Sequence, residues 1–196
     1  VERSFIKPEP QTNLLVCTKL PCYLIPAITT ARNGDIIAIA DYRHNGADIG
    51  FGGQLDLHAK ISKDNGATWS KAPLIVVDGS KYKNGSANAT HYMNTGFGDP
   101  CLVADRESDR VLLMSCSGSV SFPSGTRNNH LGIVRFYSND NGQTWSEPEE
   151  ISESIYAQFD TCTIGTANSM FIGSGRIFQS STVKVKDYYR LYCSVL

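Results

Sequence analysis

The sequence lacks an excess of charge of either sign and lacks any long hydrophobic run. Its 196 residues carry 18 lysine and arginine against 19 aspartate and glutamate residues, for a formal net charge of −1. A surface that binds nucleic acid would show as a basic excess, and there is none. No apolar stretch approaches the ~20 residues of a transmembrane helix, and no cationic amphipathic stretch indicates a membrane surface. We therefore expect neither nucleic acid nor a membrane as a partner.

Cysteine and histidine are also scarce. The six cysteines are too few for a disulfide scaffold in a chain of this length, and no two of them form a C-x-x-C pair. The four histidines show no spacing typical of metal ligands. We expect no metal and no cofactor, and we expect the cysteines to act mostly as small core residues.

No segment has a sustained helical period with caps. Instead, short runs of β-branched and apolar residues recur between turn residues, with a turn every ~8–12 positions. Strands are predicted at residues 27–30, 35–40, 55–61, 74–77, 101–104, 111–116, 131–137 and 188–196. This pattern predicts an all-β fold.

One octapeptide occurs twice. Residues 62–69 read S-K-D-N-G-A-T-W and residues 138–145 read S-N-D-N-G-Q-T-W, with six of the eight positions identical. Chance rarely produces such a match in a chain of this length. The chain is therefore built from repeated units.

Each copy of the octapeptide has the chemistry of a tight turn that follows a strand. Asp64 and Asp140 can accept hydrogen bonds from backbone N–H groups just after them. The Asn-Gly pair that follows tolerates the left-handed backbone of such a loop. The two aspartates could instead be catalytic or metal-binding, but one active site does not need the same loop twice. We interpret both copies as turns that mark the fold.

The repeated unit runs strand, turn, strand, long loop, strand and octapeptide. Two polar insertions, at residues 79–97 and 117–130, lengthen the repeat beyond the ~40–50 residues of a typical propeller blade. A third unit starts around residues 175–177 and reaches residue 196 without an octapeptide. A propeller has to close to remove exposed sheet edges. We therefore expect the chain to be a fragment of a larger domain.

Further motifs resemble those of the sialidase family, in which the octapeptide is the Asp box. Residues 23–27, Y-L-I-P-A, look like the family's Y/F-R-I-P-A motif, and residues 41–48 resemble its D-x-R…D loop. Residues 98–100, G-D-P, resemble the opening of the second blade, and residues 173–177, G-S-G-R-I, that of the third. Asp boxes alone are weakly specific, but this order and spacing of motifs is strongly specific. The resemblance covers nearly the whole chain and is thinnest at residues 79–94.

The resemblance implies an all-β, six-bladed β-propeller, of which this chain covers roughly the first two to three blades. Residues 1–196 would be part of a single sialidase-like propeller domain, incomplete at the C-terminal end. The implied activity is that of a retaining exo-α-sialidase, which releases terminal sialic acid from glycoconjugates. A tyrosine is the family's nucleophile, because a carboxylate would be repelled by the anionic sugar. A glutamate activates it, an aspartate acts as general acid and base, and three arginines hold the substrate carboxylate.

Three residues of this chain take family roles by position. Asp48 matches the acid/base aspartate and lies in the loop 44–53, whose glycines could let its carboxyl reach the leaving group. Arg43 matches the arginine beside the sugar, and Asp99 matches the aspartate that helps to bind a sugar hydroxyl. We expect Arg43 and Asp99 to pair. Asp48 could also be a solvated loop carboxylate, and the other two could form an ion pair without further function.

Leu24 departs from the family pattern. The family has its first carboxylate-binding arginine here, and leucine cannot donate to a carboxylate. Loss of one donor from a buried charged contact costs ~2–5 kcal/mol, so substrate binding should weaken by orders of magnitude. The second hypothesis is therefore a non-catalytic or degenerate Asp-box propeller that binds glycans or proteins. The nucleophilic tyrosine, its glutamate and the other two arginines are expected in later blades, outside this chain.

The resemblance also implies the partners. These are sialylated glycans of glycoproteins, glycolipids or oligosaccharides, together with the remaining blades of the same propeller. Because sialoglycans lie outside cells, we expect a secreted, periplasmic or cell-surface protein.

Overall fold

Strands make up most of the regular structure. The computed structural model describes residues 20–83, 86–87, 92–163 and 165–196, so part of the first predicted insertion lies outside the described residues. Within them, the helical segments are short: η1 (Gly79–Tyr82), η2 (Phe122–Ser124), η3 (Ala157–Phe159) and α1 (Ser152–Tyr156). The predicted all-β class is confirmed.

The first sheet contains four strands in chain order, each antiparallel to the next. Its strands are β1 (Cys22–Thr30), β2 (Ile36–Arg43), β3 (Leu55–Ser62) and β4 (Leu74–Val77). The predicted strands lie within these bounds or differ from them by one residue at an end, apart from β1, which starts five positions before residue 27. The early start follows from a β-bulge between Leu24 and Ala27, which interrupts the apolar alternation of β1.

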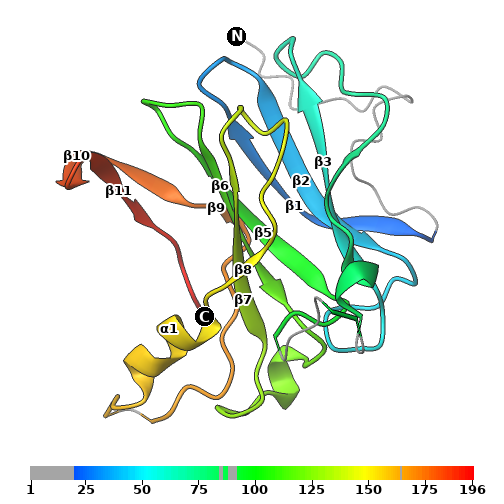
Figure 1. Ribbon diagram of the computed structural model, residues 1–196, viewed down its shortest axis with the longest axis vertical. Coiled ribbons are helices and arrows are strands. Elements are labelled where there is room, and N and C mark those ends of the chain that lie inside the picture. Colours follow the sequence, from blue (N-terminus) through cyan, green and yellow to red (C-terminus); the bar gives the residue numbers. More distant parts are fainter. Residues whose placement is uncertain (1–19, 84–85, 88–91, 164) are drawn as a thin grey trace, which may run out of the picture.

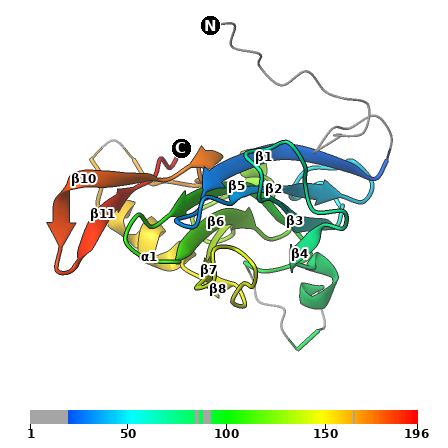
Figure 2. The same cartoon turned by 90° about the horizontal axis from the view of Figure 1, so that it is seen from above.

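The second sheet repeats the first. Its strands in chain order are β5 (Phe97–Ala104), β6 (Val111–Ser117), β7 (Gly132–Ser138) and β8 (Glu149–Glu150). The short strand β9 (Gly175–Arg176) adds to it in parallel beside β5. In both sheets an Asp box connects the third strand to the fourth, as a repeated unit requires. Figure 2 shows the two sheets side by side.

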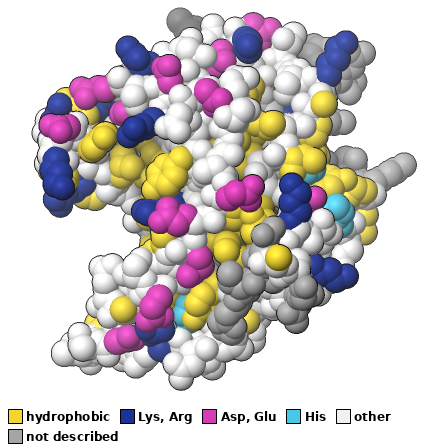
Figure 3. Space-filling view, viewed as in Figure 1, with side chains coloured by type: hydrophobic (Ala, Val, Ile, Leu, Met, Phe, Trp, Pro, Cys, Tyr) yellow, Lys and Arg dark blue, Asp and Glu magenta, His cyan; other side chains and the backbone are white. Residues whose placement is uncertain are grey.

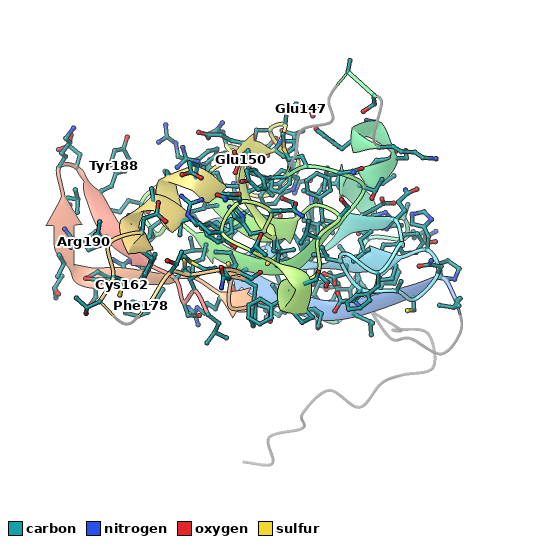
Figure 4. All side chains as sticks on the ribbon, turned by 90° about the horizontal axis from the view of Figure 1, so that it is seen from below. Glu147, Glu150, Cys162, Phe178, Tyr188 and Arg190 are labelled. Atoms are coloured by element: carbon teal, nitrogen blue, oxygen red, sulfur yellow. The ribbon has the colours of Figure 1, made fainter. Side chains whose placement is uncertain are left out.

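The third unit is a hairpin of β10 (Phe178–Val185) and β11 (Tyr188–Tyr192). The prediction missed β10 because its sequence, F-Q-S-S-T-V-K-V, shows no apolar alternation over most of its length, and Ser180 is its one buried residue. The predicted strand 188–196 ends at Tyr192. Figure 4 shows Phe178, Tyr188 and Arg190 on the hairpin, well to one side of the sheets. A groove lies between the hairpin and the second sheet, and hydrophobic side chains border the notch beside it (Figure 3).

A shared hydrophobic core holds the two sheets together. Ile37 and Leu57 of the first sheet pack in one cluster with Phe97, Leu113 and Phe136 of the second, and all five side chains are fully buried. Each such side chain contributes about 1.5–3 kcal/mol when it leaves water. The sheets are therefore joined by apolar packing as well as by the loops between them.

Both Asp boxes fold as predicted. Asp140 accepts hydrogen bonds from the Thr144 backbone N–H at 2.9 Å, the Thr144 hydroxyl at 2.6 Å and the Ser138 hydroxyl at 2.8 Å. In the first copy Asp64 accepts the equivalent three bonds, from the Thr68 backbone N–H, the Thr68 hydroxyl and the Ser62 hydroxyl. Asn65 and Asn141 have left-handed backbones with φ of 57° and 56°. The two aspartates close turns, as the sequence indicated.

The Asp boxes lie at one end of the sheets, and the loop 44–53 lies at the other. Ser62, the first residue of one box, pairs with Ile36 at the start of β2, whereas Arg43 ends β2 and pairs with Leu55. In Figure 1 the Asp-box loops are at the top, and the loop 44–53 and α1 are near the bottom. Residues 41–48 therefore cannot share a site with either box.

Replacement of Asp140 by alanine should destabilise the second sheet. The Asp140→Ala variant loses three hydrogen bonds to its carboxylate, so we expect a decrease of about 1–3 kcal/mol in the free energy of unfolding. Urea denaturation of the full-length protein measures this. The matched control is Asp187→Ala, at an exposed turn position between β10 and β11, which should change the free energy by less than ~0.5 kcal/mol. Equal effects of the two variants would contradict the prediction.

Candidate functional site

A buried ion pair stands at the end of β2. Asp41 and Arg43 are two positions apart on this strand, so their side chains point to the same face of the sheet. The Arg43 guanidinium donates to the Asp41 carboxylate from Nη2 at 2.8 Å and from Nε at 3.3 Å. The Asp41 side chain is 0% exposed and that of Arg43 is 6% exposed. Burial of a charge requires a partner of this kind.

Asp48 joins the ion pair from the loop 44–53. Its Oδ1 lies 3.0 Å from Arg43 Nη2 and also accepts the backbone N–H of Ile49 at 2.8 Å. The loop packs closely against the backbone at Ser121. The approach requires glycine at position 50, because a Cβ atom there would lie 2.1 Å from the Ser121 backbone nitrogen. The Asp48 side chain is 56% exposed, so its carboxylate combines a buried anchor with access to solvent.

Asp99 reaches the same cluster from the second sheet. It lies at a β-bulge of β5 between Gly98 and Cys101, with a left-handed φ of 54°. Its backbone N–H donates to Asp41 Oδ1 at 3.0 Å. Gly98 allows this approach, because a Cβ there would lie 3.1 Å from Asp41 Oδ2. A bulge at such a position turns the side chain toward a site.

Burial opposes the charged form of two carboxyl groups in this cluster. Burial raises the pKa of Asp41 from 3.8 to about 7, although hydrogen bonds from Arg43 oppose the shift. Burial also raises the pKa of Asp99, and the charge of Asp48 adds to that effect. Among the described residues, Arg43 is the one cation within ion-pair distance of these carboxylates. One cation faces three carboxyl groups.

Leu24 lies beside this cluster. It is the direct cross-strand partner of Asp41 in the ladder between β1 and β2, so the two side chains share a face of the sheet. The next residue, Ile25, has a φ of 49°, which is rare for a β-branched side chain and marks the bulge before Pro26. The position where the family has arginine is therefore adjacent to Asp41, one of the three carboxyl groups that share the single cation Arg43.

The three residues selected from the sequence lie close together, with one correction. The expected pair of Arg43 and Asp99 does not form. Arg43 pairs instead with Asp41 and Asp48, because Asp41 precedes it on the same strand face and Asp99 offers Asp41 its backbone N–H. Asp41 itself was missed as a site residue, although the spacing D-x-R on a strand indicates that the two side chains are neighbours.

Two further features were expected to be absent from the chain, a metal site and a membrane-spanning helix. No group of three or more His, Cys, Asp or Glu side chains there could hold a metal ion. No helix among those residues is both long and apolar enough to cross a membrane.

The first comparison with known proteins supports the interpretation of the two octapeptides as Asp boxes. The BNR/Asp-box repeat family model matches residues 60–71 and 136–147. A curated sialidase of Bacteroides fragilis is 26% identical over 142 residues, which cover 68% of this chain and 25% of that protein. A curated sialidase of Clostridium perfringens is 27% identical over 170 residues, which cover 82% of this chain and 40% of that protein.

A solved structure shows the same fold. The Hadza microbial sialidase Hz136 superposes with a TM-score of 0.62 at 21% identity, over 81% of this chain and 30% of that one. Sialidase structures are β-propellers, so the two sheets of this chain are propeller-type blades. The chain spans between 25% and 40% of the length of the two curated relatives.

The fold and the repeats define a propeller-type Asp-box protein. The repeats, the curated relatives and the solved structures together support an N-terminal portion of a sialidase-family domain.

The buried Asp41 carboxyl should make stability depend on pH. The folded state binds the Asp41 proton more tightly than the unfolded chain does, so its contribution is complete below about pH 4 and is lost as the pH rises to about 7. The loss amounts to at most about 1.4 kcal/mol per pH unit. We expect Asp41→Asn to flatten this decline of the free energy of unfolding in the full-length protein.

Urea denaturation between pH 4 and pH 8 measures the decline. Asp187→Asn, at the exposed turn between β10 and β11, is the control and should keep the wild-type slope. Parallel curves for wild type and Asp41→Asn would show that Asp41 is not the group that titrates.

Proposed function

We propose that the whole protein is a retaining exo-α-sialidase and that this chain supplies the acid/base side of its active site. The domain would be a six-bladed propeller, with residues 1–196 in its first two to three blades. The observation that carries the proposal is the contact of Asp48 with the buried pair of Arg43 and Asp41. That contact fixes an accessible carboxyl group at the end of the sheets opposite the Asp boxes.

Asp48 is suited to act as the general acid and base. A leaving sugar needs a proton on the glycosidic oxygen, and a carboxyl group on a loop can reach that oxygen. Its side chain is 56% exposed, so the desolvation that favours a protonated acid has to come from the bound substrate. The contact with Arg43 would be exchanged for a contact with the substrate as the acid becomes protonated.

Arg43 and Asp99 are suited to bind the sugar beside Asp48. The guanidinium carries five donors, and its bonds to Asp41 and Asp48 use Nη2 and Nε, so Nη1 remains for a ligand. Asp99 has a raised pKa caused by burial, so its carboxyl can either accept from or donate to a sugar hydroxyl. The nucleophilic tyrosine, its glutamate and the remaining arginines would come from later blades.

A second candidate function follows from Leu24. Leucine next to Asp41 leaves three carboxyl groups with one cation, and this arrangement repels an anionic sugar. A propeller that binds neutral glycans or proteins without hydrolysis would tolerate such a site. The two candidates differ in whether the full-length protein turns over a sialoside.

The proposed function also sets the partners. The substrates would be sialylated glycans on glycoproteins, glycolipids or free oligosaccharides, and no cofactor takes part. Such substrates lie outside cells, so we propose a secreted, periplasmic or cell-surface protein.

Asp48→Asn should abolish most hydrolysis of sialyllactose. The leaving group there is a sugar hydroxyl, which needs protonation, so we expect kcat/KM to decrease by about 10²–10⁴-fold. The side chain keeps its shape, so the unfolding midpoint of the full-length protein should stay unchanged. Asp187→Asn, at the exposed turn between β10 and β11, is the control and should retain activity within a factor of about three. Full activity of Asp48→Asn would exclude it as the acid.

Leu24→Arg should increase sialidase activity. The new guanidinium would lie across from Asp41 and add the donor that the substrate carboxylate lacks. A recovered contact worth about 2 kcal/mol or more corresponds to an increase of about 30-fold or more in kcat/KM. The assay uses a fluorogenic sialoside and the full-length protein, with Leu24→Met as a volume-matched control. No turnover by either wild type or Leu24→Arg would refute the enzyme and favour the binding protein.

A further inference from the structure

We propose that His44, Gln54 and Asp56 form a clasp that positions the Asp48 loop, so that these are positioning residues for the general acid. The inference rests on the proposed function of Asp48. In this chain the three residues stand where the loop leaves the sheet, directly outside the cluster around Arg43. We call them the loop clasp.

The clasp closes the loop at its base. The His44 backbone N–H donates to the Gln54 carbonyl at 3.2 Å, so residues 45–53 leave and return to the sheet at one point. Across that point, the His44 ring Nε2 lies 2.7 Å from Asp56 Oδ2. Because a carboxylate only accepts, this contact is a hydrogen bond in the tautomer that carries the hydrogen on Nε2, and the Gln54 amide nitrogen lies 3.1 Å from the same ring nitrogen. The Gln54 amide donates to Asp56 Oδ1 at 3.0 Å.

Asp56 gives the clasp a rigid foundation. Its side chain is 7% exposed, and it lies within β3 opposite Tyr42 of β2. Its Oδ1 also accepts the backbone N–H of Gly79 at 2.8 Å, which fixes the carboxylate from the far side. Gln54 has a second, longer bond of 3.4 Å to Asp78 Oδ1. Asp56 therefore connects the side chains of His44 and Gln54 to strand β3 and to the backbone of Gly79.

The clasp is coupled to Asp48 through the backbone. His44 directly follows Arg43, whose guanidinium holds the Asp48 carboxylate at 3.0 Å. Three residues separate His44 from Asp48. The Asp48 carbonyl accepts the Phe51 N–H at 3.1 Å, which closes a tight turn. A shift at residue 44 or 54 thus changes where the turn sets the carboxyl group. A displacement of about 1 Å of a catalytic group can lower a rate by about 10²-fold.

A purely structural role would have a different signature. His44 also touches Tyr42 edge-on, and Tyr42 stacks on His58 at 4.4 Å between ring centroids, so the clasp borders a packed aromatic group. If His44 served only that packing, its loss would lower stability without regard to the chemistry of the substrate. A positioning role affects the proton transfer alone. The two are separated by substrates that differ in their need for a proton.

The experiment compares two sialosides with the full-length protein, in whichever of the Leu24 or Leu24→Arg forms has turnover. Sialyllactose has a leaving group that needs protonation, and an aryl sialoside has a phenol that leaves without it. We expect His44→Ala and Gln54→Ala to lower kcat/KM at least about tenfold on sialyllactose and less than about threefold on the aryl sialoside. His44→Gln, whose amide can still donate to Asp56, should restore most of the activity on sialyllactose.

Two reference variants make each outcome decisive. Asp48→Asn defines the full leaving-group dependence, and Asp140→Ala, at the opposite end of the sheets, should lower both activities alike, if at all. Equal losses on both sialosides for His44→Ala, or no loss on either, would overturn the clasp while the proposed function stands. If Asp48→Asn shows no dependence on the leaving group, or if neither sialoside is turned over, the proposed function fails and the clasp fails with it.

Discussion

The Asp41 carboxylate is the group on which the candidate site depends. It is fully buried, and it accepts from the Arg43 guanidinium of its own strand and from the Asp99 backbone of the second sheet. One side chain thus connects the two sheets at the bulge of β5. Burial of this carboxyl raises its pKa to about 7, so the contact is stabilised by hydrogen bonds and opposed by desolvation at once. Asp48 gains its position through the same arginine.

The two ends of the sheets have different roles: one end carries the Asp-box turns and the other carries the candidate site. At one end Asp64 and Asp140 accept hydrogen bonds from backbone N–H groups of their own Asp boxes. At the other end the site is assembled from β2, β5 and the loop 44–53, and it uses bulges and left-handed residues that a regular strand would not tolerate. This separation lets the repeated turns hold the fold while the loops at the far end differ between units.

Much of the fold was predictable because its signals are local. Alternating apolar residues located most strands, and the paired octapeptides located both turns, since Asp and Asn-Gly close such loops by contacts within a few residues. The strand β10 was missed because its polar sequence packs against little. For the site, the motif positions brought Asp48, Arg43 and Asp99 to attention, but the pairing among them was wrong. Which carboxylate pairs with an arginine depends on the distances between strands in space, and the spacing of motifs along the sequence does not determine these distances.

The sequence alone determined that this chain is all-β, repeated and related in its motifs to sialidases, because turn chemistry and period-two alternation act over a few residues. It also exposed Leu24 as a departure. Only the tertiary structure decided that Asp41 is the centre of the cluster and that Leu24 lies across from it. It alone placed His44, Gln54 and Asp56 together at the base of the Asp48 loop. Ladder register and the seating of one sheet on another create these contacts, and both are set by packing over the whole core rather than by any local pattern.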